Sequence, residues 1–113
     1  MNCIFCSIVE GKIPAKIVYQ DTEVIAFHDV SPKAPTHLLV IPREHIDSLN
    51  GAKAENETLL GHILHVCSQV AKNLGLAESG YRVVTNTGAG AGQSVFHIHF
   101  HLLGGRTLGW PPG

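Results

Sequence analysis

The chain has little charge, and neither sign dominates. Only 15% of its 113 residues are charged, and eight Lys and Arg against nine Asp and Glu leave a formal net charge of −1. No stripe of basic residues is present, which argues against a nucleic-acid surface and favours a small-molecule partner. The hydrophobic share of 44% is typical of a globular protein and not of a disordered one.

Long apolar runs are also missing. The longest are far too short to span a bilayer, so we expect no membrane association. The opening residues lack the basic and apolar stretches of a secretory signal. Three cysteines, an odd number, argue against a disulfide framework. We therefore expect a cytoplasmic protein in a reducing environment, with residues 1–113 forming a single domain.

The spacing of apolar residues predicts one long helix, a short N-terminal helix and five strands. Residues 54–74 carry the long helical pattern, with Gly75 as its C-cap, and Gly11 closes a short helix at residues 3–10. The strands are expected at residues 17–20, 23–27, 37–41, 81–85 and 95–103. Because they follow mostly in hairpin order, we expect an α+β fold with a five-stranded antiparallel sheet.

Three histidines alternate with apolar residues in the last predicted strand. His97, His99 and His101 are therefore expected on one face, and Phe96, Ile98, Phe100 and Leu102 on the other. Along a strand, His97 and His101 stand about 13 Å apart, too far for all three imidazoles to bind one metal ion. Separate roles are therefore expected for the three histidines, the plainer alternative being a solvated polar face.

A row of imidazoles beside flexible backbone suits chemistry on a phosphate. His99 is the predicted nucleophile, because one nitrogen of a neutral imidazole can attack phosphorus while the other donates to a fixed acceptor. His101 and His37 are expected to supply positive charge or hydrogen bonds to phosphate oxygens. The glycine-rich residues 86–94 allow close backbone approach, and the Ser94 hydroxyl can donate to a phosphate oxygen or leaving group. No Lys follows the glycines, so this is not a P-loop, and alone it is equally an ordinary loop.

The segment His97–Leu103 resembles the His-φ-His-φ-His-φ-φ motif of the histidine triad (HIT) family, where φ is an apolar residue. Residues 27–32, 35–37, 92–94 and 110–113 are similar to the family's Hint branch, the purine nucleoside phosphoramidases. The resemblance implies a homodimer with one ten-stranded sheet. It also implies hydrolysis of the P–N bond between a purine nucleoside monophosphate and an amine, with no organic cofactor.

The resemblance further implies a set of substrate contacts. His99 matches the nucleophile, and Asp29 matches the carboxylate that accepts the ribose hydroxyls. The purine pocket would contain Phe5, Ile8, Phe27, His28 and Val30, and the ribose and phosphate would be held by Asn86, Gly92, Gln93, Ser94 and His101. Without the resemblance, the apolar members of the pocket would be read as core and Asp29 as a turn residue. In the family the tail at residues 110–113 reaches toward the partner's active site and affects substrate choice.

Cys3 and Cys6 form a C-x-x-C pair, a spacing at which two thiolates can bind one Zn²⁺. Zinc-containing HIT proteins complete this site with two histidines, which correspond here to His45 and His97. We therefore expect a structural zinc site, the alternatives being buried thiols or a redox pair. His62 and His65 are expected to be exposed or at a dimer contact, and Cys67 to be a small core residue.

Two other classes of function compete with phosphoramidate hydrolysis. One is a non-catalytic dimer that binds purine nucleotides and acts through protein partners. The other is a dinucleoside polyphosphate hydrolase or nucleotidyltransferase. His99 accompanied by Ser94 and a second histidine favours catalysis over binding alone.

Overall fold

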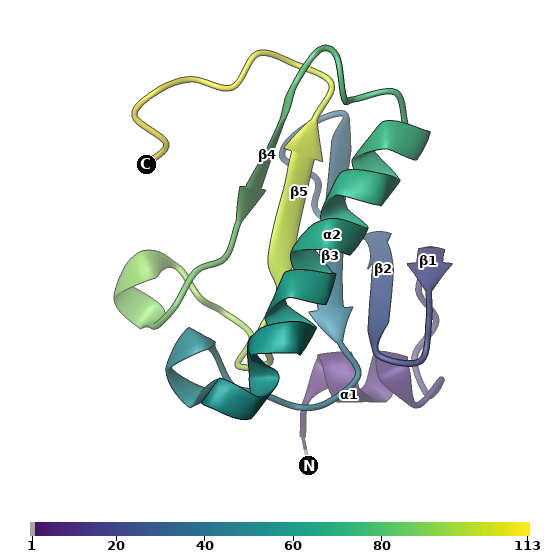
Figure 1. Ribbon diagram of the computed structural model, residues 1–113, viewed down its shortest axis with the longest axis vertical. Coiled ribbons are helices and arrows are strands. Elements are labelled where there is room, and N and C mark those ends of the chain that lie inside the picture. Colours follow the sequence, from purple (N-terminus) through teal and green to yellow (C-terminus); the bar gives the residue numbers. More distant parts are fainter. Residues whose placement is uncertain (1) are drawn as a thin grey trace.

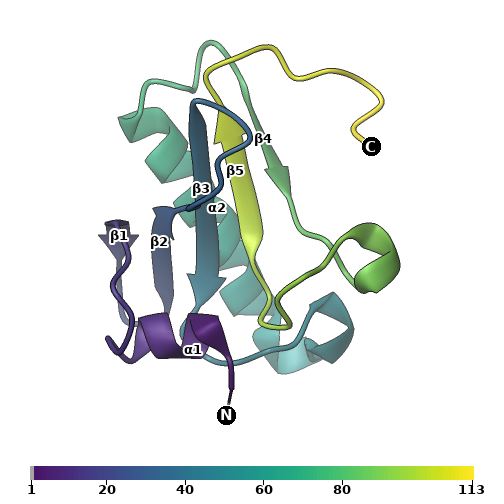
Figure 2. The same cartoon turned by 180° about the vertical axis from the view of Figure 1, so that it is seen from behind.

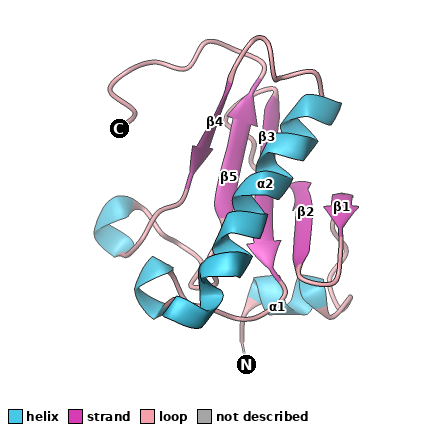
Figure 3. Cartoon of the chain, viewed as in Figure 1, coloured by secondary structure: helices cyan, strands magenta, loops and turns pink. Residues whose placement is uncertain are grey.

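The computed structural model describes residues 2–113 and shows one antiparallel sheet with strand order β1–β2–β3–β5–β4. The long helix α2 crosses one face of the sheet, and the short helix α1 lies behind one end of it (Figures 1 and 2). The elements are α1 (Ile4–Val9), β1 (Ile17–Gln20), β2 (Val24–His28), β3 (Thr36–Pro42), α2 (Glu57–Asn73), β4 (Tyr81–Val84) and β5 (Phe100–Gly104). Short 3-10 turns lie at Leu49–Gly51, Ala54–Asn56 and Ala89–Ala91 (Figure 3). The predicted α+β fold is confirmed.

The central strands β2 and β3 are buried on both faces, so their sequences read as continuous apolar runs. One set of their side chains packs beneath α2, and the alternate set packs toward α1. The first set is Val24, Ala26, Leu38 and Val40, and the second is Ile25, Phe27, Leu39 and Ile41. The sheet therefore carries two apolar clusters, and the smaller one adjoins the predicted site.

The helix ends agree with the glycine signals in the sequence. Gly11 and Gly75 follow α1 and α2 with φ of 75° and 76°, a left-handed conformation that glycine adopts without steric cost. The predicted start of the long helix at Ala54 is a 3-10 turn, and regular α-helix begins at Glu57.

The last strand is shorter than predicted, because regular pairing begins only at Phe100, opposite Val40 of β3. The backbone just before it is satisfied elsewhere: Ile98 N–H donates to the Ile46 carbonyl at 2.6 Å, and the Thr85 hydroxyl donates to the His99 carbonyl at 2.8 Å. The predicted strand over residues 95–99 is therefore wrong.

The alternation of side chains nevertheless continues through this irregular segment. Ile98 joins Phe100 and Leu102 in the cluster beneath α2, while the His97 and His99 rings contact Phe5 of α1. Phe96, expected with the core residues, is instead 50% exposed. Within residues 2–113, no helix has the length and apolar character needed to cross a membrane.

Candidate active site and metal site

A cleft of about 1000 Å³ opens beside the smaller apolar cluster. It is bounded by α1, residues 13–16, the end of β2 and the segment that precedes β5. Nine predicted substrate contacts line it: Phe5, Ile8, Phe27, His28, Asp29, Val30, Ser94, His99 and His101. Sequence reasoning missed Ile4, Ile13, Pro14, Ala15, Lys16, Pro32, Leu39 and Val95. Their spacing in the sequence does not indicate a shared site, because only the folded chain brings them together.

Three other predicted contacts lie outside the cleft lining. Asn86, Gly92 and Gln93 are not among the described residues that line the cleft. The Gln93 side chain is buried and holds backbone together: its Nε2 donates to the carbonyls of Asp47 and Val95, and its Oε1 accepts from Gly88 N–H. Gln93 therefore braces the glycine-rich loop, and direct nucleotide contact by these three residues stays a prediction.

His99 is held in one tautomer by its own segment of backbone. Its Nδ1–H donates to the carbonyl of His97 at 2.8 Å, because a carbonyl can only accept. In the neutral ring, Nε2 therefore keeps its lone pair. The ring lines the cleft and packs edge-on against Phe5, with 5.1 Å between ring centroids. This is the arrangement that a nucleophilic imidazole requires.

His37 and His101 form a directed hydrogen-bonded pair. The backbone N–H of Lys33 donates to His37 Nδ1 at 3.0 Å, so the Nε2 of a neutral His37 carries the proton. That Nε2 lies 2.9 Å from His101 Nδ1, which therefore accepts. His101 in turn keeps its own proton on Nε2. His37 stands behind His101 rather than in the cleft lining.

Burial keeps both histidines of this pair neutral. Burial, followed by the neighbouring rings of His99 and His37, lowers the pKa of His101 to about 4. Burial also lowers the pKa of His37, against the opposing charge of Asp29. Of the two contributions expected from these rings, positive charge or hydrogen bonds, their neutral state near neutral pH favours hydrogen bonds, and His101 offers an N–H donor.

Asp29 stands beside this pair at the edge of the cleft. Its Oδ1 accepts from the backbone N–H of Ser31 at 2.7 Å, and its Oδ2 lies 3.4 Å from His37 Nε2. Asp29, His37 and His101 are close enough to be considered as metal ligands. However, the Nδ1 of His37 already accepts from Lys33, so its Nε2 has no free lone pair for a cation unless the ring becomes an imidazolate. The geometry is that of a hydrogen-bond chain.

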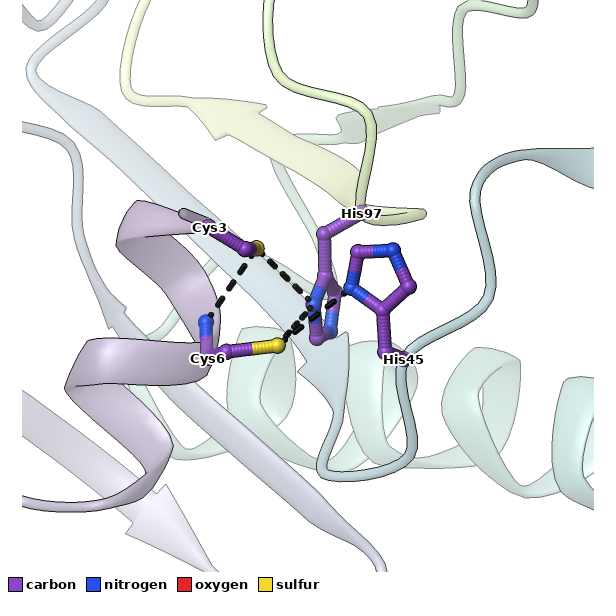
Figure 4. Close-up of side chains that lie close together, drawn as sticks. All are labelled: Cys3, Cys6, His45 and His97. Carbon is purple, nitrogen blue, oxygen red and sulfur yellow. Dashed lines mark hydrogen bonds between the residues drawn. The ribbon is translucent and has the colours of Figure 1, made fainter. Parts of the chain in front are cut away.

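Cys3, Cys6, His45 and His97 converge as expected from the sequence (Figure 4). Their ligand atoms all lie within 4.8 Å of one another. His97 Nδ1 lies 3.5 Å from Cys3 Sγ and 3.6 Å from Cys6 Sγ, and His45 Nδ1 lies 3.3 Å from Cys6 Sγ. Zinc bonds of about 2.3 Å to sulfur and about 2.0 Å to nitrogen place such atoms roughly 3.5 Å apart in a tetrahedron.

The second ring nitrogens of His45 and His97 are also placed as in a metal site. His97 Nε2–H donates to the Pro42 carbonyl at 2.8 Å, and His45 Nε2–H donates to Asp47 Oδ1 at 2.9 Å. Both rings therefore present an Nδ1 lone pair to the sulfur atoms, as metal-binding histidines do. Burial lowers the pKa of His97, which favours the neutral ring that a metal needs. The residues fit a four-coordinate zinc site.

The C-terminal tail is fastened to β4. Arg82 donates from Nη2 to the carbonyl of Gly109 at 2.8 Å, and its guanidinium lies 5.9 Å from the centre of the Trp110 ring. Trp110 is 82% exposed. The tail runs outward from the end of β5 (Figure 1).

Comparison with known proteins gives consistent results. Residues 10–108 match the HIT domain family. An uncharacterized HIT-like protein of Synechococcus elongatus is 54% identical over 112 residues, which cover 99% of this chain and 97% of the relative. The purine nucleoside phosphoramidase of Escherichia coli is 51% identical over 106 residues, covering 94% and 89% of the two chains.

A solved structure extends the likeness to the fold. The crystal structure of a HIT family hydrolase from Legionella pneumophila has a TM-score of 0.97 and 50% identity, covering 99% of this chain and 100% of that one. Matching sequence, fold and histidine motif together show that this chain belongs to the HIT domain family.

Proposed function

We propose that this protein is a hydrolase that cleaves the P–N bond of purine nucleoside 5′-phosphoramidates through a nucleotidyl group on His99. The observation that carries the proposal is the hydrogen bond from His99 Nδ1 to the His97 carbonyl, which leaves Nε2 unprotonated at the cleft. The Escherichia coli relative, a purine nucleoside phosphoramidase at 51% identity, supports this choice of substrate.

The cleft has separate surfaces for each part of such a substrate. Phe5, Ile8 and Phe27 form an apolar wall for a purine, and Val30 at the mouth is 97% exposed and accessible to it. Asp29 is the acceptor for the ribose hydroxyls, since one carboxylate can take two O–H donors. A wall with few base-specific polar groups suits adenine and guanine equally.

In the first step, His99 Nε2 attacks phosphorus, the bond from phosphorus to the amine nitrogen breaks, and the Ser94 hydroxyl gives its proton to the departing nitrogen. His101 Nε2–H and the Ser94 hydroxyl are donors at the cleft for the phosphate oxygens, where negative charge increases. Water then attacks the nucleotidyl-histidine and releases the monophosphate. One proton of this water returns to Ser94 and its hydroxyl group goes to phosphorus, so His99 and Ser94 end the cycle as they began.

Replacing the nucleophile tests the mechanism. We expect His99→Ala to lower kcat for an AMP phosphoramidate by about three orders of magnitude or more, because the covalent route is lost. AMP binding should be largely retained, as measured by calorimetry. His65→Ala on the exposed side of α2 is the control and should keep full activity.

The covalent intermediate can be trapped directly. Acid-labile nucleotide on His99 should be found by mass spectrometry after rapid quenching, and the configuration at phosphorus should be retained overall. Inversion without any trapped nucleotide would contradict the mechanism. Nucleotide binding without turnover by the native protein would indicate a non-catalytic binder instead.

The neutral state of His101 predicts how stability depends on pH. An unfolded histidine titrates near 6.5, whereas the pKa of His101 in the fold is about 4, so the unfolded chain binds more protons between these values. The free energy of unfolding should therefore fall as the pH falls from about 6.5 to about 4. Urea unfolding at pH 7 and pH 5 should show a smaller fall in His101→Gln than in the native chain. Equal falls in the free energy of unfolding of the two proteins would contradict the assignment of His101 as neutral.

We also propose that Cys3, Cys6, His45 and His97 bind one structural zinc ion. When bound, the ion cross-links α1 to the segment after β3 and the segment before β5. Phe5 lies between the two cysteines in the sequence and contacts Phe27 and His99, so the position of α1 shapes the cleft wall. Four protein donors leave no open coordination position, which favours a structural role over a catalytic one.

Metal analysis tests this assignment. The purified protein should contain about one zinc per chain, and Cys3→Ser should lose most of it, together with thermal stability. Cys67→Ala is the control, because Cys67 lies on the buried face of α2 in the other apolar cluster, and this variant should keep the metal. Equal zinc in Cys3→Ser and the native protein would remove Cys3 from the site.

We propose that two copies associate through β4 into a ten-stranded sheet. Of the two edge strands, β1 has a register shift between Ile17 and Tyr19, whereas β4 pairs with β5 in unbroken register. A bulge disfavours further pairing, so β4 is the better edge for a second copy. Sedimentation should give twice the chain mass of 12.1 kDa, and a monomer would contradict the proposal.

A further inference from the structure

A second hollow, of about 510 Å³, adjoins the cleft. Ile4, Ser94 and Val95 line both spaces, so the two are neighbours across the Ser94–Val95 backbone. The second hollow is otherwise lined by Asn2, Cys3, His45, Asp47 and Phe96. Ser94 is the one of these lining residues that the proposed nucleotide contacts use.

The order of groups in the substrate indicates what this hollow receives. Base, ribose, phosphate and amine follow one another along a nucleoside phosphoramidate. The apolar wall around Phe27 takes the base, and His99, His101 and Ser94 surround the phosphorus. The amine is the next group along, and Ser94 is the residue at which the cleft meets the second hollow.

The lining of the hollow has a clear chemical preference. The Asp47 side chain is 71% exposed, and the hydrogen bond from His45 uses its Oδ1. Phe96 is 50% exposed, although its position in the sequence pattern predicted burial. Among the described residues that line this hollow there is no Lys or Arg. A carboxylate beside an exposed aromatic ring suits an alkyl group that ends in a positive charge.

We propose that this second hollow is the leaving-group subsite and that it selects amines carrying a second, cationic group, such as diamines or basic amino acids. The inference rests on the proposed phosphoramidase function. Asp47 determines specificity through charge, and Phe96 contacts the apolar linker.

Two substrates of equal length test this proposal. One is AMP amidated with 1,5-diaminopentane, and the other is AMP amidated with hexylamine, which replaces the terminal ammonium by a methyl group. We expect kcat/KM to favour the cationic substrate, and Asp47→Asn to lower this preference by about fivefold, the upper range for an exposed ion pair. The preference should also weaken at high salt.

Glu44→Gln is the matched control, because it removes the same charge from an exposed position in the same loop, outside both hollows. It should keep the native preference. The side-chain amide oxygen that Asp47→Asn introduces can still accept from His45, and zinc content should be measured in both variants to verify this.

The outcomes separate this inference from the proposed function. If both substrates are turned over and the ratio of their kcat/KM values is the same in the native protein and in Asp47→Asn, the subsite is overturned and the phosphoramidase function remains. Turnover of neither would overturn the function. The affinities of His99→Ala for the two compounds would then decide the subsite, because equal dissociation constants contradict it.

Discussion

The hydrogen bond from His99 Nδ1 to the His97 carbonyl is the interaction on which the rest of the site depends. His97 is itself held at three points. Its Nδ1 faces Cys3 and Cys6, its Nε2 donates to Pro42, and its carbonyl orients His99. His97 therefore connects the cluster of Cys3, Cys6 and His45 to the proposed nucleophile, and a shift in the position of one would move the other through two residues of backbone.

The electrostatics of the cleft are those of neutral donors rather than of fixed cations. Burial lowers the pKa of His37 and of His101, so both rings are uncharged near neutral pH. The hydrogen bond from Lys33 N–H to His37 Nδ1 fixes which nitrogen of each ring carries the proton. Oriented N–H groups cost little reorganisation when charge develops on a phosphate. The anionic substrate that we propose could therefore be bound without a cluster of Lys and Arg, in agreement with the net charge of −1.

Much of this arrangement could be predicted from the sequence, and the failures share one cause. The alternation of histidine and apolar residues correctly separated His99 and His101 from Phe100 and Leu102, yet it implied a regular strand where none exists. Regular pairing does not extend back beyond Phe100, because the Ile98 N–H bonds to Ile46 and not to a neighbouring strand. Such a choice of partner is non-local, and period-two spacing does not reveal it.

The sequence by itself determined most of the elements, most of the buried faces and the candidate site residues, because periodicity, glycine caps and residue chemistry are local properties. Only the tertiary structure decided the functional geometry. It brought α1 against the segment before β5, set the tautomers of five histidines, placed Gln93 where it braces the glycine-rich loop, and placed Asp47 in the hollow beside the cleft. Most of these outcomes depend on contacts between residues far apart in the chain, where packing chooses among partners that the sequence leaves equally possible. The His99 bond to the His97 carbonyl is local, but it needs the irregular backbone that the bond from Ile98 to Ile46 accompanies.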